Sequence, residues 1–523
     1  MRFAALPPGA AFRSKLVPAV VVVALGDWIF YQRGLLGGNC SFFGWALLAA
    51  MLVGRPAVRR DRRAWIALLA AALFAFAYLC DPSLLAWTLF WVTAGMATLL
   101  PATARFDDGW RWLQRLVWQA VCVPFGPLID LVRLGRVRGK GRAARTNLRA
   151  GIALLALPLG GSAVILTLFA AANPLVEQAL SALVPDISLM LVPRAMLWTV
   201  LFVMAWSLLR PRIARRLLPG LDRAGAGALP GVSVASVTLS LVVFNAIFAV
   251  QNLLDAAYLW GLAPLPEGMT LAGYAHRGAY PLIATALLAA AFVLVTLRPG
   301  SDTARSPTIR RLVTAWIVQN VFLVASSMLR TLDYVEVYSL TRLRIAALAW
   351  MALVGFGLAA ICWRLLRGRS GAWLVNVNGV AAALVLTVAC FVDLDAVAAR
   401  WNVRHAREVG GSGAALDLCY LSDLGDSSVL ALVELERRPG LDPALRERVR
   451  AVALDRIAGL EQGQRFGWTL LGQRRLAAVR GDRERLGPPP RWGERGCDGA
   501  LIPPRPLTDP APEQPTLTGA RGK

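Results

Sequence analysis

Long apolar runs separated by short polar segments dominate the chain, and this pattern predicts its fold class. Each run holds about 20 residues, the length that an α-helix needs to cross the hydrocarbon core of a bilayer. The chain is 57% hydrophobic and only 17% charged, whereas soluble domains carry about 25% charged residues. We therefore expect an all-α integral membrane protein with about eleven transmembrane helices, at residues 16–32, 35–54, 64–80, 84–103, 150–174, 190–209, 233–255, 280–298, 312–330, 343–366 and 371–393.

One of these runs becomes polar along a single helix face. Within residues 244–280, Asn245, Asn252 and Asp255 are spaced seven and three residues apart, which places them on one side of a helix, with Gln251 nearby. A polar stripe inside hydrocarbon needs partners or water. This stripe is the strongest indication of function in the sequence, although it identifies no substrate.

Further polar groups gather near the outer ends of several predicted spans. The members of this candidate polar cluster are Asn245, Gln251, Asn252, Asp255, His276, Arg277, Gln319, Asn320, Asp333, Glu336, Tyr338, Arg342, Arg344, Asn376 and Asn378. Within the cluster, Gln319 and Asn320 lie deeper, near the middle of a span, where interhelical hydrogen bonds are common.

Three interpretations of the candidate polar cluster remain open. The cluster could be a network of ion pairs and hydrogen bonds that ties the outer helix ends together. It could line an outward-facing cavity that binds a polar or anionic solute through Arg277, Arg342 or Arg344. It could also hold a hydrolytic or transferase site, since acid–base chemistry requires carboxylates near a cleft.

The distribution of Lys and Arg predicts how the chain is threaded. Thirty of these residues fall in alternate connections and six in the others, and the basic side faces the cytoplasm. The N-terminus is then cytoplasmic, and eleven spans place the C-terminus in the periplasm of a bacterium, whose inner membrane would hold the protein. The net charge of +24 does not predict nucleic-acid binding, because the basic residues stand between apolar runs.

The connection 104–149 has a character of its own. Residues 110–132 mix Trp and Leu with Arg, which predicts an amphipathic helix in the inner headgroup layer. The basic run 133–149 either binds anionic lipid headgroups or serves only as a topology signal. Arg194, which opens the sixth span, either extends toward the outer surface or pairs with an acid in the bundle.

After residue 393 the chain becomes polar, and the composition divides the protein into five parts. Leu441–Leu460 predicts a helix that Asp442 caps, with Pro443 in its first turn. The five parts are an N-terminal four-helix membrane region (1–103), a cytoplasmic amphipathic and basic connection (104–149), a seven-helix membrane core (150–393), a small periplasmic helical domain (394–486) and a disordered Pro-rich tail (487–523).

Few residues suit metal or nucleotide chemistry. The chain has two histidines and no C-x-x-C pair, so we expect no metal site and no cofactor. It also contains no P-loop, no H-E-x-x-H, no G-x-S-x-G and no dinucleotide-binding glycine pattern, which argues against ATP-driven transport by this chain alone. Cys419 and Cys497 fall in the expected periplasmic domain, where a disulfide between them could persist.

Several long segments resemble a bacterial multi-pass membrane family catalogued as domain of unknown function 4173. The main segments lie between about residues 245 and 393 and include FNAIFAVQNLLDAAYLWG, VASSMLRTLDYVEVYSLTRLRIAALAWM and AWLVNVN. Shorter matches are ANPLVE at Ala172–Glu177 and Arg-Pro-Arg at Arg210–Arg212. The resemblance covers about 250 residues and leaves out the N-terminal spans and the periplasmic domain. It implies that the polar stripe is a family feature, and it supplies no activity, substrate or catalytic residue.

The sequence thus favours a non-catalytic membrane component that senses or scaffolds at the bacterial envelope. Its expected partners are the lipid bilayer, anionic headgroups at the cytoplasmic face and a protein in the periplasm. A transporter of a small polar or anionic solute is the alternative. A membrane-embedded enzyme acting on lipid or envelope precursors is the third interpretation.

Overall fold

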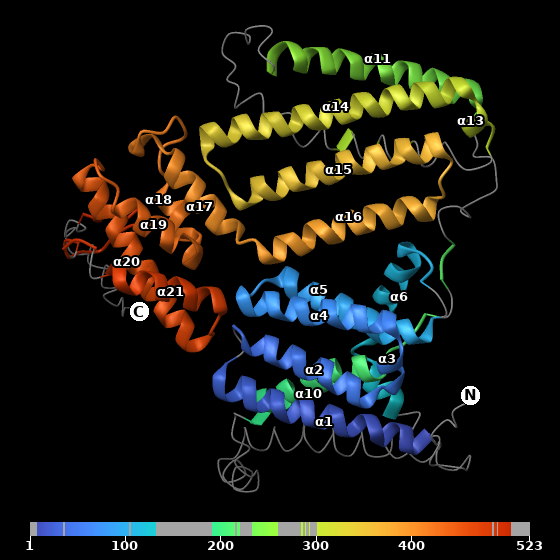
Figure 1. Cartoon of the computed structure of the whole chain (residues 1–523), viewed down its shortest axis with the longest axis horizontal. Helices are drawn as coiled ribbons and strands as arrows, with labels where there is room; N and C mark the ends of the chain where they lie inside the picture. The colour runs from blue at the N-terminus through green and yellow to red at the C-terminus, as the bar shows by residue number, and fades with distance from the viewer. Residues whose placement is uncertain are drawn as a thin grey trace, which may run out of the picture. The chain divides into compact units, whose positions relative to one another are not determined.

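The chain forms two compact units in a computed structural model (Figure 1). The membrane unit comprises Met1–Leu394 and Glu461–Arg474, and the C-terminal unit comprises Asp395–Leu460 and Arg475–Lys523. The residues that the structure describes are 8–34, 37–103, 106–131, 191–214, 217–219, 233–259, 284, 285, 288, 292, 301–483, 486–488 and 490–503.

The first group of helices in the membrane unit packs around large buried side chains. Phe43, Phe90 and Trp206 are each at most 1% exposed, and they come from three different helices. Asp61 and Ser83 cap α4 and α5 by accepting hydrogen bonds from the first turn. The group consists of α1 (Pro8–Arg33), α2 (Asn39–Gly54), α3 (Pro56–Arg60), α4 (Arg62–Cys80), α5 (Leu84–Leu99), η1 (Leu100–Ala102), α6 (Gly109–Cys122) and α10 (Leu191–Leu209).

The second group forms a row in which each long helix packs on the next in chain order (Figure 1). Trp316 and Met351 lie in its core. Side chains of Ser306, Thr341 and Ser370 cap the helices that follow them, so a polar residue marks where each of these three helices begins. The group consists of α11 (Val234–Leu259), α13 (Asp302–Arg305), α14 (Pro307–Tyr338), α15 (Arg342–Arg367) and α16 (Gly371–Phe391).

Eight helices in the described residues are long and apolar enough to cross a membrane. Their outward faces are apolar, with Ile66, Leu343 and Val380 each at least 70% exposed, as a lipid-facing surface requires. The helix α2 is also apolar but shorter, at 16 residues. The predicted spans 150–174 and 280–298 lie wholly or largely outside the described residues, so the number eleven stays a prediction.

The helix α6 is amphipathic, and its exposed face is the apolar one. Leu113 and Val117 are each about half exposed, whereas Arg115 and Gln119 on the opposite side are buried. A helix with apolar side chains outward is suited to lipid contact rather than to water. The amphipathic segment expected from the sequence is therefore present, although the helix ends at Cys122.

The membrane unit includes residues 461–474, which the sequence assigns to the periplasmic domain. The amide of Gly38 donates a hydrogen bond to the carbonyl of Trp468 at 2.7 Å. A Cβ atom added at Gly37, whose φ is +69°, would lie 2.3 Å from the carbonyl carbon of Gly467. Glycine is therefore needed at position 37 for both its conformation and this close approach.

The C-terminal unit is a small helical bundle. Val429, Val433, Ile457, Leu460 and Val479 form a buried apolar cluster. The helix expected over 441–460 is α20, and Asp442 accepts a hydrogen bond from its first turn at 2.9 Å. The helices are α17 (Leu394–His405), η2 (Arg407–Val409), α18 (Leu418–Asp423), η3 (Gly425–Ser428), α19 (Val429–Glu436), α20 (Pro443–Phe466) and α21 (Leu470–Arg483).

Residues 490–503 are fixed to the helices of the C-terminal unit. A disulfide joins Cys419 to Cys497, and Arg495 forms an ion pair with Glu447 at 2.8 Å. These contacts order a segment that the sequence predicts to be disordered. Residues beyond 503 lie outside the described part of the chain.

Candidate functional site

The polar stripe of α11 faces α14 and forms a ladder of hydrogen bonds with it. Asn245 donates from Nδ2 to the carbonyls of Leu241 at 2.7 Å and Leu312 at 3.1 Å. Gln319 donates from Nε2 to Oδ1 of Asn245 at 2.8 Å, and Asn252 donates to the carbonyl of Gln319 at 3.2 Å. The spacing of Asn245 and Asn252, two helical turns, aligns both with the same partner helix.

The ladder ends in a buried ion pair between Asp255 and Arg330. The side chain of Asp255 is fully buried and that of Arg330 is 3% exposed, and Arg330 donates to Oδ1 of Asp255. Gln251, one turn earlier on α11, donates to the same oxygen at 2.9 Å. Two opposite charges are stable at this depth only when each compensates the other.

Three side-chain amide oxygens in and beside the ladder are buried without a hydrogen-bond partner among the described residues. They are Oδ1 of Asn252, Oε1 of Gln319 and Oδ1 of Asn320. The amide nitrogen of Asn320 donates to the carbonyl of Trp316 in its own helix at 2.8 Å. An unsatisfied buried acceptor costs about 1–3 kcal/mol, so these atoms are the part of the ladder that could hold a water or a small donor.

The connection from α14 to α15 is held by Arg344. Its guanidinium donates to the carbonyls of Tyr338, at 2.6 Å, and Ser339, and it lies over the ring of Tyr334 at 4.5 Å. Ser339 has a φ of +70°, a conformation that favours glycine. Arg344 therefore clamps a strained turn, which is a structural task.

The remaining members of the candidate polar cluster on this side lie near the connection from α14 to α15 or outside the described residues. Glu336 is exposed and Asp333 is half-buried, both near the end of α14, and Arg342 begins α15 and interacts with neighbouring groups. His276 and Arg277 lie outside the described residues. His276 and Arg277 are therefore not assigned to this site.

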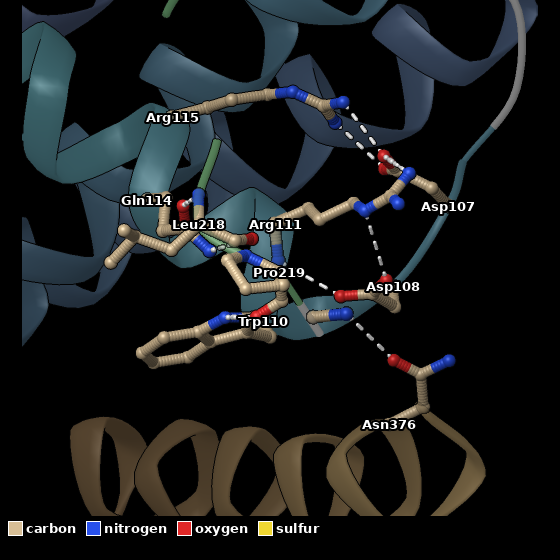
Figure 2. A network of polar contacts seen from close by, with 10 residues as sticks. Asp107, Asp108, Trp110, Arg111, Gln114, Arg115, Leu218, Pro219 and Asn376 are labelled. Atoms are coloured by element: carbon tan, nitrogen blue, oxygen red, sulfur yellow. Dashed lines mark hydrogen bonds and ion pairs between the residues drawn. The ribbon is translucent and has the colours of Figure 1, made fainter. Parts of the chain in front are cut away.

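Asn376 and Asn378 lie on α16, outside the ladder between α11 and α14. Asn378 donates to the carbonyl of Leu374 in its own helix at 2.9 Å. Asn376 accepts a hydrogen bond from the amide of Gly109 at 2.8 Å and so joins α16 to the start of α6 (Figure 2). The structure therefore separates these two residues from the ladder and places Asn376 in a second polar network.

That second network surrounds the start of α6 (Figure 2). Arg115 forms a two-pronged ion pair with Asp107, with both N–O distances at 2.7 Å. Asp108 caps the helix by accepting from the amide of Arg111 at 2.9 Å. Burial alone would raise the pKa of Asp107, but the hydrogen bonds from Arg115 and Arg111 outweigh it and hold that pKa below its ordinary value.

Sequence reasoning missed this network, although a signal was present. Asp107 and Asp108 precede an amphipathic segment with Arg111 and Arg115 four and eight residues after Asp107. Acids before a helix and bases one and two turns into it are the arrangement that capping and i,i+4 pairing favour.

Asp27 and Asp130 form further ion pairs in the membrane unit. Arg194 pairs with Asp27 at 2.5 Å, so it binds an acid of α1, one of the two arrangements that the sequence left open. Asp130, 3% exposed, pairs with Arg212 at 3.1 Å and accepts from the indole of Trp206 at 3.0 Å. The Asp27–Arg194 pair joins α1 to α10, and Asp130 binds the residues that follow α10.

No group of three or more metal-ligating side chains occurs in the described part of the chain. The residues of the ladder offer amides, one carboxylate and one guanidinium, which bind through hydrogen bonds. The ladder can therefore lock two helices or hold a polar molecule, and it carries no nucleophile paired with a base.

The fold and these buried pairs define an all-helical, multi-pass membrane protein. A family model described as Domain of unknown function (DUF4153) matches residues 64–435, which is more than half of the 523-residue chain. The chain belongs to this family. No curated protein and no solved structure matches the chain.

The resemblance to domain of unknown function 4173 is therefore wrong. The family match begins in α4 and ends in α19, well beyond the segments that suggested that resemblance. Bilayers restrict helices to a narrow composition in which apolar runs are broken by Asn, Gly and Arg. Strings of this kind consequently recur in different multi-pass families and do not separate one from another.

Proposed function

We propose that this protein is a non-catalytic scaffold or sensing component of a bacterial inner membrane. The Asp255–Arg330 pair carries this proposal, because both charges are enclosed between α11 and α14 and compensate each other. A cavity of about 420 Å³ in the membrane unit lies elsewhere, between α5, α6 and α10, and no ladder residue lines it. The ladder thus holds α11 firmly against α14 and stabilises the outer surface of the protein.

The orientation belongs to the same proposal. The N-terminus lies in the cytoplasm, eleven spans cross the bilayer, and the domain over residues 394–486 lies in the periplasm, where it docks a protein partner. The disulfide between Cys419 and Cys497 supports this orientation, because disulfides persist in the oxidising periplasm. The thirty basic residues on the opposite side favour contact with anionic headgroups of the cytoplasmic leaflet.

A reporter that is active only in the periplasm, fused after Asp393, tests the orientation. Activity of the fusion supports an odd number of spans and a periplasmic C-terminal unit. Activity of a cytoplasm-dependent reporter at the same position would overturn both.

Thiol labelling tests the closed ladder. In the full chain with its free cysteines replaced and the Cys419–Cys497 bridge kept, Asn252→Cys is compared with Glu336→Cys, an exposed position near the end of α14. A membrane-impermeant maleimide should modify the Glu336→Cys protein and leave the Asn252→Cys protein unmodified until it is unfolded. Both proteins are labelled after denaturation, which confirms that each thiol is reactive.

A transporter of a small polar solute is the second candidate. Buried oxygens of Asn252 and Gln319 that have no partner in the described part of the chain favour it, because a hydrogen-bond donor would satisfy them. Labelling of Asn252→Cys at the rate of Glu336→Cys would show a water-filled path past the ladder. That result would replace the scaffold proposal with this second one.

A further inference from the structure

A cavity opens between three helices of the membrane unit. Its volume is about 420 Å³, within the range of about 300–1,000 Å³ that small-molecule sites occupy. The residues that line it are Thr88, Trp91, Val92, Gly95, Leu116, Gln119, Ala120, Val123, Met204, Ser207 and Leu208. No charged side chain belongs to the described part of this lining, so the cavity suits an uncharged, mostly apolar molecule.

Gln119 is the exception to this apolar character. It is 7% exposed, and its Oε1 atom is buried without a hydrogen-bond partner among the described residues. The hydroxyls of Thr88 and Ser207 each donate to a carbonyl of their own helix at 2.7 Å. Gln119 therefore presents an unused acceptor to a cavity whose two hydroxyl groups already donate elsewhere.

A glycine on the neighbouring helix α5 leaves space beside the Gln119 amide. Gly95 of α5 stands opposite, and a Cβ atom added there would come within 3.2 Å of Leu116 and 3.7 Å of Oε1 of Gln119. A larger residue at position 95 would fill part of the cavity. Glycine at this position leaves the space beside this acceptor without a side chain.

We propose that this cavity binds the hydrocarbon chain of a neutral lipid whose hydroxyl group donates a hydrogen bond to Oε1 of Gln119. The wall formed by α6 turns Leu113 and Val117 outward, each about half exposed, so this wall lies against the bilayer from which such a lipid would enter. An apolar lining makes van der Waals contacts with a hydrocarbon chain, and one placed polar group fixes the orientation of that chain. A hydroxyl satisfies the acceptor without bringing a charge into the membrane.

Competition photo-crosslinking tests this assignment on the purified full chain in phosphatidylcholine nanodiscs. The probe is oleyl alcohol with a diazirine in its chain. The competitors are unlabelled oleyl alcohol and oleyl methyl ether, which share the chain and differ in the hydroxyl donor. We expect crosslinks in α5, α6 and α10, with the alcohol competing at about fivefold lower mole fraction than the ether, the ratio that one net hydrogen bond gives.

Two variants and one control locate the site. Gln119→Leu should abolish the difference between the two competitors while keeping the crosslinks. Val92→Trp should fill the cavity and remove the crosslinks. Val117→Trp adds the same bulk on the lipid-facing side of α6 and should leave both results unchanged.

Three outcomes would overturn the proposal. Equal competition by alcohol and ether in the unmodified protein would mean that only an acyl chain is bound. Crosslinks that persist in the Val92→Trp protein would place the probe outside the cavity. A fivefold preference that survives Gln119→Leu would mean that another group accepts the hydroxyl.

Discussion

Replacing Asp255 by Asn tests the buried ion pair at the end of the ladder. This change removes the negative charge and leaves the guanidinium of Arg330, whose side chain is 3% exposed, without its compensating charge. Breaking a buried pair in this way costs about 3–5 kcal/mol, far more than the loss of an exposed pair, about 0–1 kcal/mol. We expect the free energy of unfolding of the membrane unit to fall by the larger amount.

The assay is chemical unfolding of the full chain in detergent, followed by circular dichroism. Glu336→Gln is the matched control, because it removes an exposed acid from α14 and should change the free energy of unfolding by no more than about 0.5 kcal/mol. A double variant, Asp255→Leu with Arg330→Met, removes both charges together. Gln251 then loses its acceptor, so the free energy of unfolding of this protein should be only about 1–2 kcal/mol lower than that of wild type.

The pattern of the three variants decides the interpretation. The Asp255→Asn protein should be the least stable, and the double variant should have intermediate stability. The Glu336→Gln protein should be indistinguishable from wild type. If the free energy of unfolding of the Asp255→Asn protein lies within about 1 kcal/mol of the wild-type value, the ion pair is hydrated and the reasoning from burial fails.

Three further predictions concern the turn and the C-terminal unit. Ser339→Gly should raise the free energy of unfolding by about 1 kcal/mol, because glycine adopts a φ of +70° without strain; a decrease would show that the turn is not strained. Cys419→Ser should lower the stability of the C-terminal unit by about 2–4 kcal/mol, since the bridge to Cys497 closes a separation of 78 residues, and wild-type protein under reducing conditions should unfold at the same midpoint as this variant. Hydrogen bonds from the side chain of Arg495 and the backbone amide of Arg491 hold the pKa of Glu447 below its ordinary value. Unfolded chains then bind the proton more readily, so the unit should lose stability as the pH falls below about 5, and a Glu447→Gln protein that shows the same pH profile would refute this cause.

The spacing of polar residues in the sequence was enough to predict which side chains of α11 form the ladder. It did not predict that Arg330 is the partner of Asp255. A helical period placed Asn245, Asn252 and Asp255 on one face, and the structure turns all three toward α14. Arg330 was placed at the last position of the predicted span 312–330 and was assigned no partner. The helix α14 continues to Tyr338, so this arginine lies inside a helix and reaches the acid on α11.

Long-range contacts explain the remaining differences. Asn376 was grouped with the outer cluster from its polarity, but its partner is the amide of Gly109, 267 positions earlier. No local pattern reports such a pairing, since it depends on how α6 and α16 pack. Residues 490–503 were predicted to be disordered from their Pro and Gly content, and a disulfide and ion pairs with α20 order them instead.

An experimental structure of the full chain in a lipid nanodisc, at a resolution that shows ordered water, tests the central claim most directly. The scaffold proposal predicts that Asp255 and Arg330 stay paired and that no continuous column of water joins the outer surface to Gln319. A water-filled cavity that reaches Gln319 and Asn320, with Arg330 separated from Asp255, would contradict it.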